Sequence, residues 1–189
     1  MRAGPRERLI LGTIEQMREY GVAGMGLSAL LERSNASRNS LYQHFPNGKG
    51  ELVAAATARA GAHMSGVIGR AVSSDGPAEW TAAMTDWWRR DLRRSEFAAG
   101  CPITSAALDE GDPQVQAAGA AALAEWAGIL SDALMAHGVV ASEAPSLARF
   151  VISALEGAVV QSRALKSSQP LDDLDRLIPL LIQSAAQIE

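Results

Sequence analysis

No strand can be traced in this sequence, whereas the marks of helix ends recur along its whole length. Sustained apolar–polar alternation is absent, and the hairpin-type pair Asn47-Gly48 has no β-branched run beside it. Cap residues followed by proline stand at 75–77, 112–113 and 142–145. Because proline suits the first turn of a helix, these segments predict helix starts. The expected fold class is all-α.

About nine helices are expected. Their approximate ranges are 5–20, a short helix around 27–31, a third around 41–45, then 47–72, 77–95, a short helix at 105–108, 113–137, 145–166 and 171–187. The third helix is expected to end at Pro46. Pro179 lies inside the last helix, where it is expected to bend the helix or remove one hydrogen bond.

Length and composition favour a globular protein of one domain or of a small module attached to a larger one. The 189 residues are 48% hydrophobic and include a single cysteine, so no intramolecular disulfide is possible. No secretory signal is visible, and the longest small-apolar stretch, 117–124, is too short to span a bilayer. We therefore expect a cytoplasmic protein without a membrane partner.

Charge is distributed unevenly. Residues 1–50 carry seven Arg or Lys against four Glu, a net charge of +3, while the remaining residues sum to −7. A basic head on an acidic body suggests that the head contacts a polyanion such as nucleic acid. The alternative is an ordinary solvated surface.

The basic head contains the pattern of a helix-turn-helix. Two short apolar-periodic segments, 27–34 and 38–45, are separated by only three residues. Asn35 tolerates the positive φ that such a turn needs, and Ser37 is a good N-cap for the second segment. An αα-hairpin with a polar surface is the alternative interpretation.

If Leu41 and Phe45 face inward, the polar residues of the second segment face outward. A helix fits the major groove, where arginine pairs with guanine and Asn or Gln with adenine. Tyr, His and Lys side chains nearby suit phosphate oxygens. The predicted DNA-contacting residues are Ser37, Arg38, Asn39, Ser40, Tyr42, Gln43, His44 and Lys49.

The run 37–45 followed by Pro46-Asn47-Gly48-Lys49-Gly50-Glu51-Leu52 resembles the DNA-binding signature of the TetR family of bacterial repressors. Gly100-Cys101-Pro102-Ile103, the segment 154–158 and Arg163-Ala164 are similar to the branch of the lincomycin-resistance repressor, of the LmrA/YxaF type. The resemblance implies a DNA-binding domain at 1–50, with the helix at about 47–73 as connector. It also implies a ligand-binding and dimerisation domain at 74–189.

The same resemblance implies a homodimer that pairs through its last two long helices and binds double-stranded DNA at a palindromic operator. The apolar residues of those helices are Leu147, Phe150, Val151, Leu155, Val159, Leu174, Leu177, Ile178 and Leu181. At least one face of this set must belong to the protein's own core, so the sequence leaves the interface undivided. Small residues at Ala154, Gly157 and Ala158 would allow close approach of two helices.

Two departures from the family pattern affect the DNA-binding head. Met25-Gly26 stand where the family usually has Thr or Ser, so Gly26 can cap the second helix only through its backbone. Arg38-Asn39 replace the usual Lys/Gly pair that opens the recognition helix. This difference changes the expected base contacts, and an operator sequence cannot be transferred from relatives.

The family senses small ligands in the body, where indole rings suit a flat aromatic or hydrophobic guest. The predicted ligand-binding residues are Trp80, Trp87, Trp88, Cys101, Trp126 and Glu156. The alternative for each tryptophan is simple core or surface packing. Cys101 is a lone thiol with no basic neighbour in sequence, so an inert role is the alternative to redox sensing.

No catalytic or metal-binding signature is evident. The three histidines, His44, His63 and His137, lack metal-site spacing, and no nucleophile elbow or glycine-rich phosphate loop is found. We expect no enzyme activity and no cofactor. The predicted function is a ligand-responsive transcriptional regulator, most simply a repressor. Two alternatives remain: a DNA-binding protein without an effector, and a helical small-molecule-binding protein that has lost DNA binding.

Overall fold

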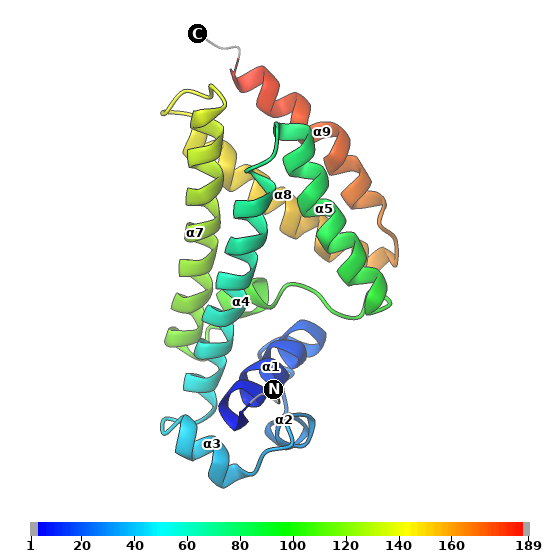
Figure 1. Cartoon of the computed structure of the whole chain (residues 1–189). Coiled ribbons are helices and arrows are strands. Elements are labelled where there is room, and N and C mark those ends of the chain that lie inside the picture. Colours follow the sequence, from blue (N-terminus) through cyan, green and yellow to red (C-terminus); the bar gives the residue numbers. More distant parts are fainter. Residues whose placement is uncertain (1–3, 187–189) are drawn as a thin grey trace. The chain divides into compact units, whose positions relative to one another are not determined.

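The computed structural model describes residues 4–186, which form nine α-helices and no strand (Figure 1). The helices are α1 (Pro5–Tyr20), α2 (Leu27–Arg33), α3 (Arg38–His44), α4 (Lys49–Ala71), α5 (Pro77–Arg94), α6 (Pro102–Ala107), α7 (Pro113–Ala136), α8 (Ala144–Leu165) and α9 (Gln169–Ala186). The predicted all-α fold is confirmed. None of the helices in this range is both long and apolar enough to cross a membrane.

The helix ends have local causes that the sequence displays. Proline occupies the first turn of α1, α5, α6 and α8, where its missing N–H costs no helical hydrogen bond. Asp112 caps α7 by accepting hydrogen bonds from the backbone N–H of Gln114 (3.0 Å) and of Val115 (3.4 Å). Gly21 ends α1 with a φ of 73°, a conformation that glycine adopts without strain.

Helices α4, α6 and α9 begin at other residues than the sequence predicts. Helix α4 begins at Lys49 rather than at 47, because Gly48 adopts a φ of 83° and its carbonyl accepts the first helical hydrogen bond, from Leu52 (3.2 Å). Helix α6 spans Pro102–Ala107 rather than 105–108, since Pro102 begins it. Helix α9 starts at Gln169 and continues through the buried Pro179. Its predicted end at 187 lies outside the described residues.

The chain forms two compact units that are not continuous in sequence. One contains the residues up to 62 together with 101–122, and the other contains 63–100 together with the residues from 123 onward. Helices α4 and α7 therefore contribute to both units. The functional division into 1–50 and 74–189 remains a prediction, since compactness and function are separate properties.

The core of the N-terminal unit joins the first three helices to α6 and to the start of α7. Leu30, Leu41 and Phe45 are buried in it, and so are Ala106 of α6 and Val115 of α7. Burial of these apolar side chains removes them from water and is the main stabilising contribution to the unit. This unit supports the short helices that carry the predicted DNA-contacting residues.

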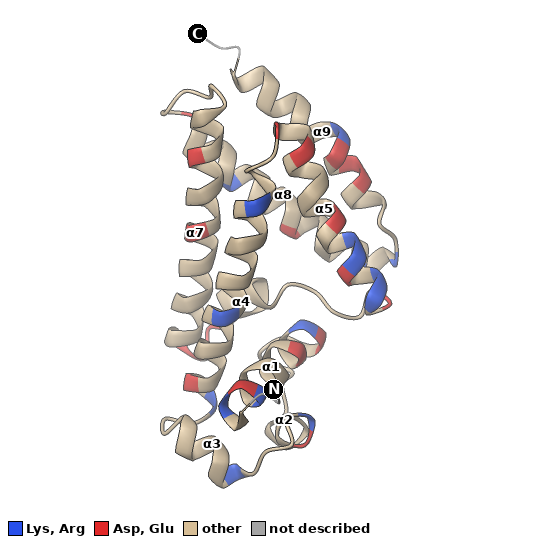
Figure 2. Cartoon of the chain, viewed as in Figure 1, with Lys and Arg blue, Asp and Glu red and all other residues tan. Residues whose placement is uncertain are grey.

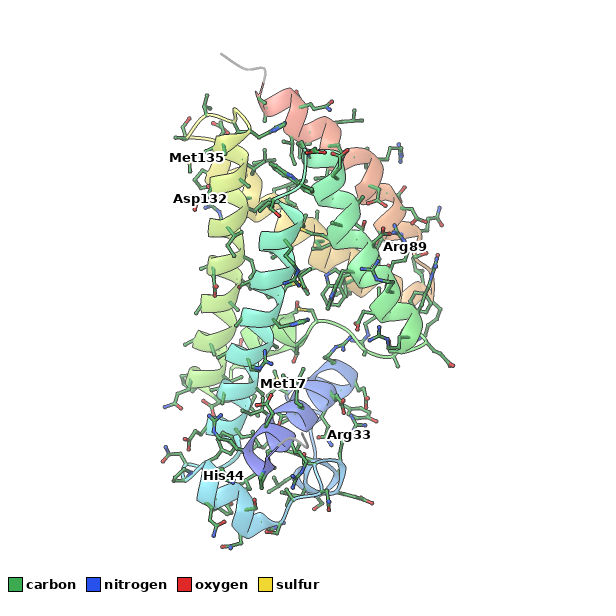
Figure 3. All side chains as sticks on the ribbon, in the orientation of Figure 1. Met17, Arg33, His44, Arg89, Asp132 and Met135 are labelled. Carbon is green, nitrogen blue, oxygen red and sulfur yellow. The ribbon has the colours of Figure 1, made fainter. Side chains whose placement is uncertain are left out.

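The C-terminal unit packs α5, α8 and α9 against one another. Trp88 of α5, Val159 of α8 and Ile182 of α9 are each 1% exposed and represent the three inner faces. Arg89 of α5 adds a polar link to α9 through ion pairs with Asp172 (2.9 Å) and Asp175 (2.7 Å). Figure 2 shows basic and acidic residues on the two helices, and Figure 3 labels Arg89.

The last two helices have two distinct apolar faces. The inner face is buried and includes Val151, Leu155, Val159 and Ile178. The outer face is exposed and includes Phe150, Val160, Leu177, Leu180 and Leu181. The structure of one chain therefore assigns seven of the nine apolar residues that the sequence left undivided to one face or the other, while Leu147 and Leu174 are half-buried.

Candidate functional site

Helices α2 and α3 form the helix-turn-helix expected from the sequence. Asn35 in the turn has a φ of 45°, which confirms the predicted left-handed conformation. The Ser37 hydroxyl accepts a hydrogen bond from the backbone N–H of Ser40 (3.1 Å), so Ser37 caps α3 as predicted. Gly26 precedes α2 without a side-chain cap, and its carbonyl accepts from Leu30 N–H (3.0 Å).

One face of α3 is buried and the opposite face is open to solvent. Leu41 and the following Phe45 are 0% and 1% exposed, whereas Tyr42 is 51% exposed. The predicted DNA-contacting residues that are exposed are Ser37, Arg38, Asn39, Tyr42, Gln43 and His44, and Ser40 is half-buried. Figure 3 labels His44 at the end of this helix. The structure thus brings this set together on one short element, and their contact with DNA remains a prediction.

Lys49 differs from the rest of that set because it is half-buried and already engaged. Its Nζ donates a hydrogen bond to the main-chain oxygen of Met25 (2.9 Å), which joins the start of α4 to the segment before α2. The first turn of α4 is closed by Glu51, whose carboxylate accepts from the backbone N–H of Asn47 (2.9 Å). Lys49 therefore has a structural contact besides its predicted phosphate contact.

Helix α1 holds the helix-turn-helix through Arg6 and Arg8, which are not among the functional residues predicted from the sequence. Arg8 donates from Nε to the Ser34 oxygen (3.0 Å) and from Nη2 to the Asn35 oxygen (3.1 Å). The Arg6 guanidinium lies over the Phe45 ring, 5.2 Å from its centroid. These partners are 26 or more positions apart, so no local sequence pattern reveals them.

A bidentate ion pair joins α1 to α2. The Arg33 guanidinium donates to both carboxylate oxygens of Glu19, at 3.0 and 2.8 Å (Figure 3 labels Arg33). These hydrogen bonds lower the pKa of Glu19 against the opposing effect of burial, and they raise the pKa of Arg33. Glu19 and Arg33 are therefore both charged at neutral pH, and the ion pair supports the placement of α2.

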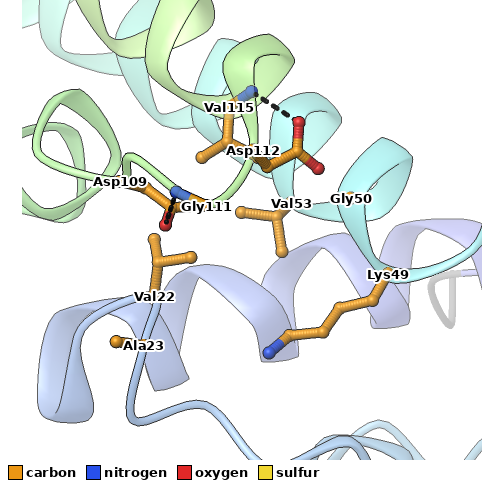
Figure 4. Close-up of a pocket in the computed structure, with 9 residues that line it drawn as sticks. All are labelled: Val22, Ala23, Lys49, Gly50, Val53, Asp109, Gly111, Asp112 and Val115. Atoms are coloured by element: carbon orange, nitrogen blue, oxygen red, sulfur yellow. Dashed lines mark hydrogen bonds between the residues drawn. The ribbon is translucent and has the colours of Figure 1, made fainter.

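A cavity of about 220 Å³ adjoins the first turn of α4 within the N-terminal unit (Figure 4). Its lining residues are Val22, Ala23, Lys49, Gly50, Val53, Asp109, Gly111, Asp112 and Val115. Asp109 accepts a hydrogen bond from Gly111 N–H (3.2 Å), and Asp112 caps α7. A Cβ on Gly50 would collide with the Asp112 carboxylate, so this position favours glycine.

The predicted ligand-binding residues fall into different units. Trp80, Trp87, Trp88, Trp126 and Glu156 belong to the C-terminal unit, whereas Cys101 belongs to the N-terminal unit, where it precedes α6. Their role in ligand binding remains a prediction. Among residues 4–186, no group of three or more His, Cys, Asp or Glu side chains is arranged to hold a metal ion.

The tryptophans of α5 differ in environment. Trp80 donates its indole N–H to the Ser74 oxygen (3.0 Å) and meets His137 edge-on, with ring centroids 5.4 Å apart. Trp87 and Trp88 form an edge-to-face pair at 4.9 Å. Trp88 is 1% exposed, and its Nε1 has no hydrogen-bond partner in the described part of the chain. A buried donor without an acceptor is costly, and Trp88 is therefore the indole that a hydrogen-bond acceptor would stabilise most.

Comparisons with known proteins agree in both halves of the chain. The family model described as "Bacterial regulatory proteins, tetR family" matches residues 9–56. The model described as "Transcriptional regulator LmrA/YxaF-like, C-terminal domain" matches residues 77–177. An uncharacterized HTH-type transcriptional regulator of Mycobacterium tuberculosis strain H37Rv is 33% identical over 186 residues, covering 95% of this chain and 94% of the relative. The HTH-type transcriptional regulator LmrA of Bacillus subtilis is 26% identical, covering 94% and 96%.

Solved structures show the same fold at lower sequence identity. A regulatory protein TetR from Rhodobacter sphaeroides superposes with a TM-score of 0.82 at 19% identity, covering 93% of this chain and 97% of that one. A TetR transcriptional regulator from Legionella pneumophila gives a TM-score of 0.81 at 18% identity, covering 95% and 98%. At these identities the likeness concerns the fold alone.

Proposed function

The chain belongs to the TetR family of bacterial regulatory proteins, with a C-terminal domain of the LmrA/YxaF type, and from this premise we propose that it is a ligand-released repressor. Two heads of a dimer bind a palindromic operator, and a small molecule in the body weakens that binding. The observation that carries the DNA-binding part is the exposed polar face of α3, held by a buried Leu41 and Phe45. Since the partner is chromosomal DNA, the protein acts in the cytoplasm.

We assign base contacts and phosphate contacts to different residues of this face. Arg38 pairs with guanine, and Asn39 and Gln43 pair with adenine, in accordance with their hydrogen-bonding groups. Phosphate and sugar contacts hold the helix in register. The residues proposed for them are Ser37, Ser40, Tyr42, His44 and Lys49.

The outer apolar face of α8 and α9 is the proposed dimer interface. Phe150, Gly157 and Val160 recur along α8 at the spacing of one helical face, and Leu177, Leu180 and Leu181 do so on α9. Nothing lies within 4 Å of a Cβ built on Gly157, which leaves this position open for the close approach of a second helix. Two such helices from each protomer would bury these apolar side chains in a four-helix bundle. Dimerisation also spaces two α3 helices for half-sites about 34–36 Å apart, or a multiple of this.

The proposed effector is an aromatic or hydrophobic molecule that carries a hydrogen-bond acceptor. The half-buried Trp87 offers aromatic surface, and the buried Trp88 that packs against it offers an unpartnered N–H donor. Helix α4 contributes residues to both compact units, so a ligand-dependent shift of α4 would alter the head. Ligand and operator then weaken each other's binding by the same factor.

In vitro selection of genomic fragments by the purified protein at physiological salt tests the DNA-binding part. At low salt any basic surface binds DNA without sequence specificity, so binding must be measured at physiological salt. We expect enrichment of a palindromic sequence. A folded protein that enriches no sequence, with or without candidate ligands, would favour the alternative of a helical binding protein without DNA-binding function.

A compound panel read out by tryptophan fluorescence and by operator release tests the effector part. For a compound that binds, Trp88→Phe removes the donor but keeps an aromatic ring, and we expect roughly tenfold weaker binding. Trp80→Phe is the comparison for the N–H alone, because the Trp80 N–H is already bonded to Ser74 and is not available to a ligand, so this variant is expected to lose less affinity than Trp88→Phe. A ligand that binds tightly and leaves operator affinity unchanged would contradict the proposed release mechanism, and failure of every compound would favour a DNA-binding protein without effector.

A further inference from the structure

We propose that Arg8 is a positioning residue for DNA recognition, which sets the direction of α3 without touching DNA. This inference rests on the proposed function of α3 as the recognition helix. Arg8 lies in the first turns of α1 and hydrogen-bonds the main-chain oxygens of two successive residues, Ser34 at 3.0 Å and Asn35 at 3.1 Å. These two residues connect the last turn of α2 to α3.

The acceptors of Arg8 are groups that a helix end leaves in need of a donor. The last carbonyls of a helix have no partner within it, and a cation near them interacts favourably with the helix dipole. Ser34 is the C-cap of α2, and Asn35 follows it in the left-handed conformation, with a φ of 45°. A planar guanidinium holds two neighbouring oxygens at a fixed separation, which a lysine ammonium does not do.

The surroundings of the turn show that α1 is its support. A Cβ on Gly12 of α1 would collide with the Ser34 hydroxyl, so the two helices meet closely at this point. One residue earlier, Arg33 binds Glu19 of α1 through two hydrogen bonds. The far end of α3 also meets α1, where Arg6 lies over the Phe45 ring.

Helix α3 depends on these contacts because it is short. Seven residues form few internal helical hydrogen bonds, and a helix of this length has little stability by itself. Its direction is therefore set by the turn that Arg8 holds and by the packing of Leu41 and Phe45 into the core. A small rotation there displaces Arg38, Asn39 and Gln43 from base edges, while less directional phosphate contacts persist.

Part of the basic charge of the head is engaged in contacts within the N-terminal unit. Figure 2 shows basic residues on α1 and α2 as well as at the start of α3. Arg6, Arg8 and Arg33 have partners inside the N-terminal unit, so their charge does not by itself indicate phosphate contact. Only Arg38 among the Lys and Arg residues lies on α3 itself.

The test compares Arg8→Lys with Arg59→Lys, a control that also conserves charge at an exposed arginine of the same unit. Binding is measured to the sequence enriched by wild-type protein and to unrelated DNA, over a series of salt concentrations. For Arg8→Lys we expect about tenfold weaker binding to the selected sequence, unchanged binding to unrelated DNA and an unchanged salt slope. Arg59→Lys is expected to match wild type in all three.

Two outcomes would overturn the proposal. Equal affinity of Arg8→Lys and wild type for the selected sequence would show that the two hydrogen bonds of the Arg8 guanidinium are dispensable for recognition. A loss shared by all DNA, with Arg8→Ala lowering the salt slope by about 0.9 per protomer, would identify Arg8 as a phosphate contact instead. A variant that merely unfolds in part loses both kinds of binding in proportion, which circular dichroism and the comparison with unrelated DNA reveal.

A second measurement does not need DNA. The amides of Asn35 and Ala36 are bonded to the oxygens of Glu32 and Leu31, each at 3.0 Å. In Arg8→Lys we expect their hydrogen exchange to quicken by about tenfold, while amides in the middle of α4 keep their protection. Unchanged hydrogen exchange at both amides would show that the Arg8 hydrogen bonds do not hold the turn. If wild-type protein selects no sequence, the proposed function fails, and this exchange measurement still decides whether Arg8 holds the turn.

Discussion

At the scale of single residues, Gly100 and Arg163 are in contact, although they stand in two segments that are far apart in the sequence. Gly100 lies against the Arg163 side chain, and a Cβ on Gly100 would stand 2.7 Å from Nη1 and 2.8 Å from Cδ of that arginine. Arg163 in turn donates to the Ala98 oxygen (2.6 Å). The absence of a side chain at Gly100 thus lets the end of α8 hold the segment that follows α5.

Replacing Gly100 with alanine is therefore expected to lower the free energy of unfolding by about 1 kcal/mol, because Arg163 must move away from its acceptor. Gly128→Ala is the control, since a Cβ at this position of α7 would meet nothing within 4 Å. That substitution is expected to raise stability by up to about 1 kcal/mol, the ordinary gain of alanine over glycine in a helix. Urea unfolding measures both. Additive effects of Gly100→Ala and Arg163→Ala would disprove the contact as the cause.

The Glu19–Arg33 pair predicts a pH dependence of stability. The folded pKa of Glu19 lies below its ordinary value of 4.5, so the pair stabilises the fold fully above 4.5 and loses its effect as the pH falls through the lowered pKa. Glu19→Gln is expected to cost below about 1 kcal/mol at pH 7, since both side chains are about a third exposed. Thermal unfolding over a pH series should show wild type and variant converging in acid. A difference that stays constant from pH 7 into acid would exclude the ion pair as its source.

At the scale of helices, one arginine of α5 forms ion pairs with two carboxylates of α9. Arg89 has a side chain that is 15% exposed and ion pairs with Asp86, Asp172 and Asp175. Burial acts to lower the pKa of Arg89, but its hydrogen bonds to Asp175 and Asp172 outweigh burial, and the pKa is raised. The carboxylates of Asp172 and Asp175 on α9 are consequently compensated in part by one cation from α5.

Arg89→Met keeps most of the apolar stem but deprives those carboxylates of this cation, and we expect a loss of about 1–3 kcal/mol in the free energy of unfolding. Arg176→Met on the same pair of helices serves as the control. Arg176 is 68% exposed and pairs only weakly with Asp173 one turn away, so its loss is expected to stay within about 0.5 kcal/mol. Chemical denaturation compares the two. Equal losses in the free energy of unfolding would show that the ion pairs between α5 and α9 stabilise the protein no more than an exposed pair does.

At the scale of the whole molecule, the proposed assembly depends on the outer face of α8 and α9. Leu177 is 48% exposed in the single chain, so a charge there is compatible with the folded protomer but not with an apolar interface. We expect Leu177→Arg to be monomeric at micromolar concentration and to bind the selected sequence at least about a hundredfold more weakly, because its two half-sites are no longer bound by one particle.

Light scattering and operator binding measure the two effects of Leu177→Arg. Leu108→Arg, at a leucine that is 75% exposed and lies outside α8 and α9, is the control and is expected to leave the dimer intact. A Leu177→Arg protein that remains a dimer would move the interface to another surface.

Local chemistry in the sequence determined most of the secondary structure. Proline in the first turns predicted the starts of α5, α7 and α8 to within one residue, and the turn at Asn35 with its cap at Ser37 followed the same local rules. The exposed face of α3 could also be foreseen, since the positions of Leu41 and Phe45 imply it. Gly48 was the exception, because its left-handed conformation, rather than Asn47, sets where α4 begins.

Only the tertiary structure decided which distant residues meet. Neither the partners of Arg8 nor the contact of Gly100 with Arg163 follows from spacing, since 26 and 63 positions separate them. The packing of Ala106 and Val115 into the core of the N-terminal unit is equally non-local, as is the division of α8 and α9 into inner and outer faces. Helix caps and turns depend on a few adjacent residues, whereas the choice of core face and of side-chain partner depends on the whole chain being packed.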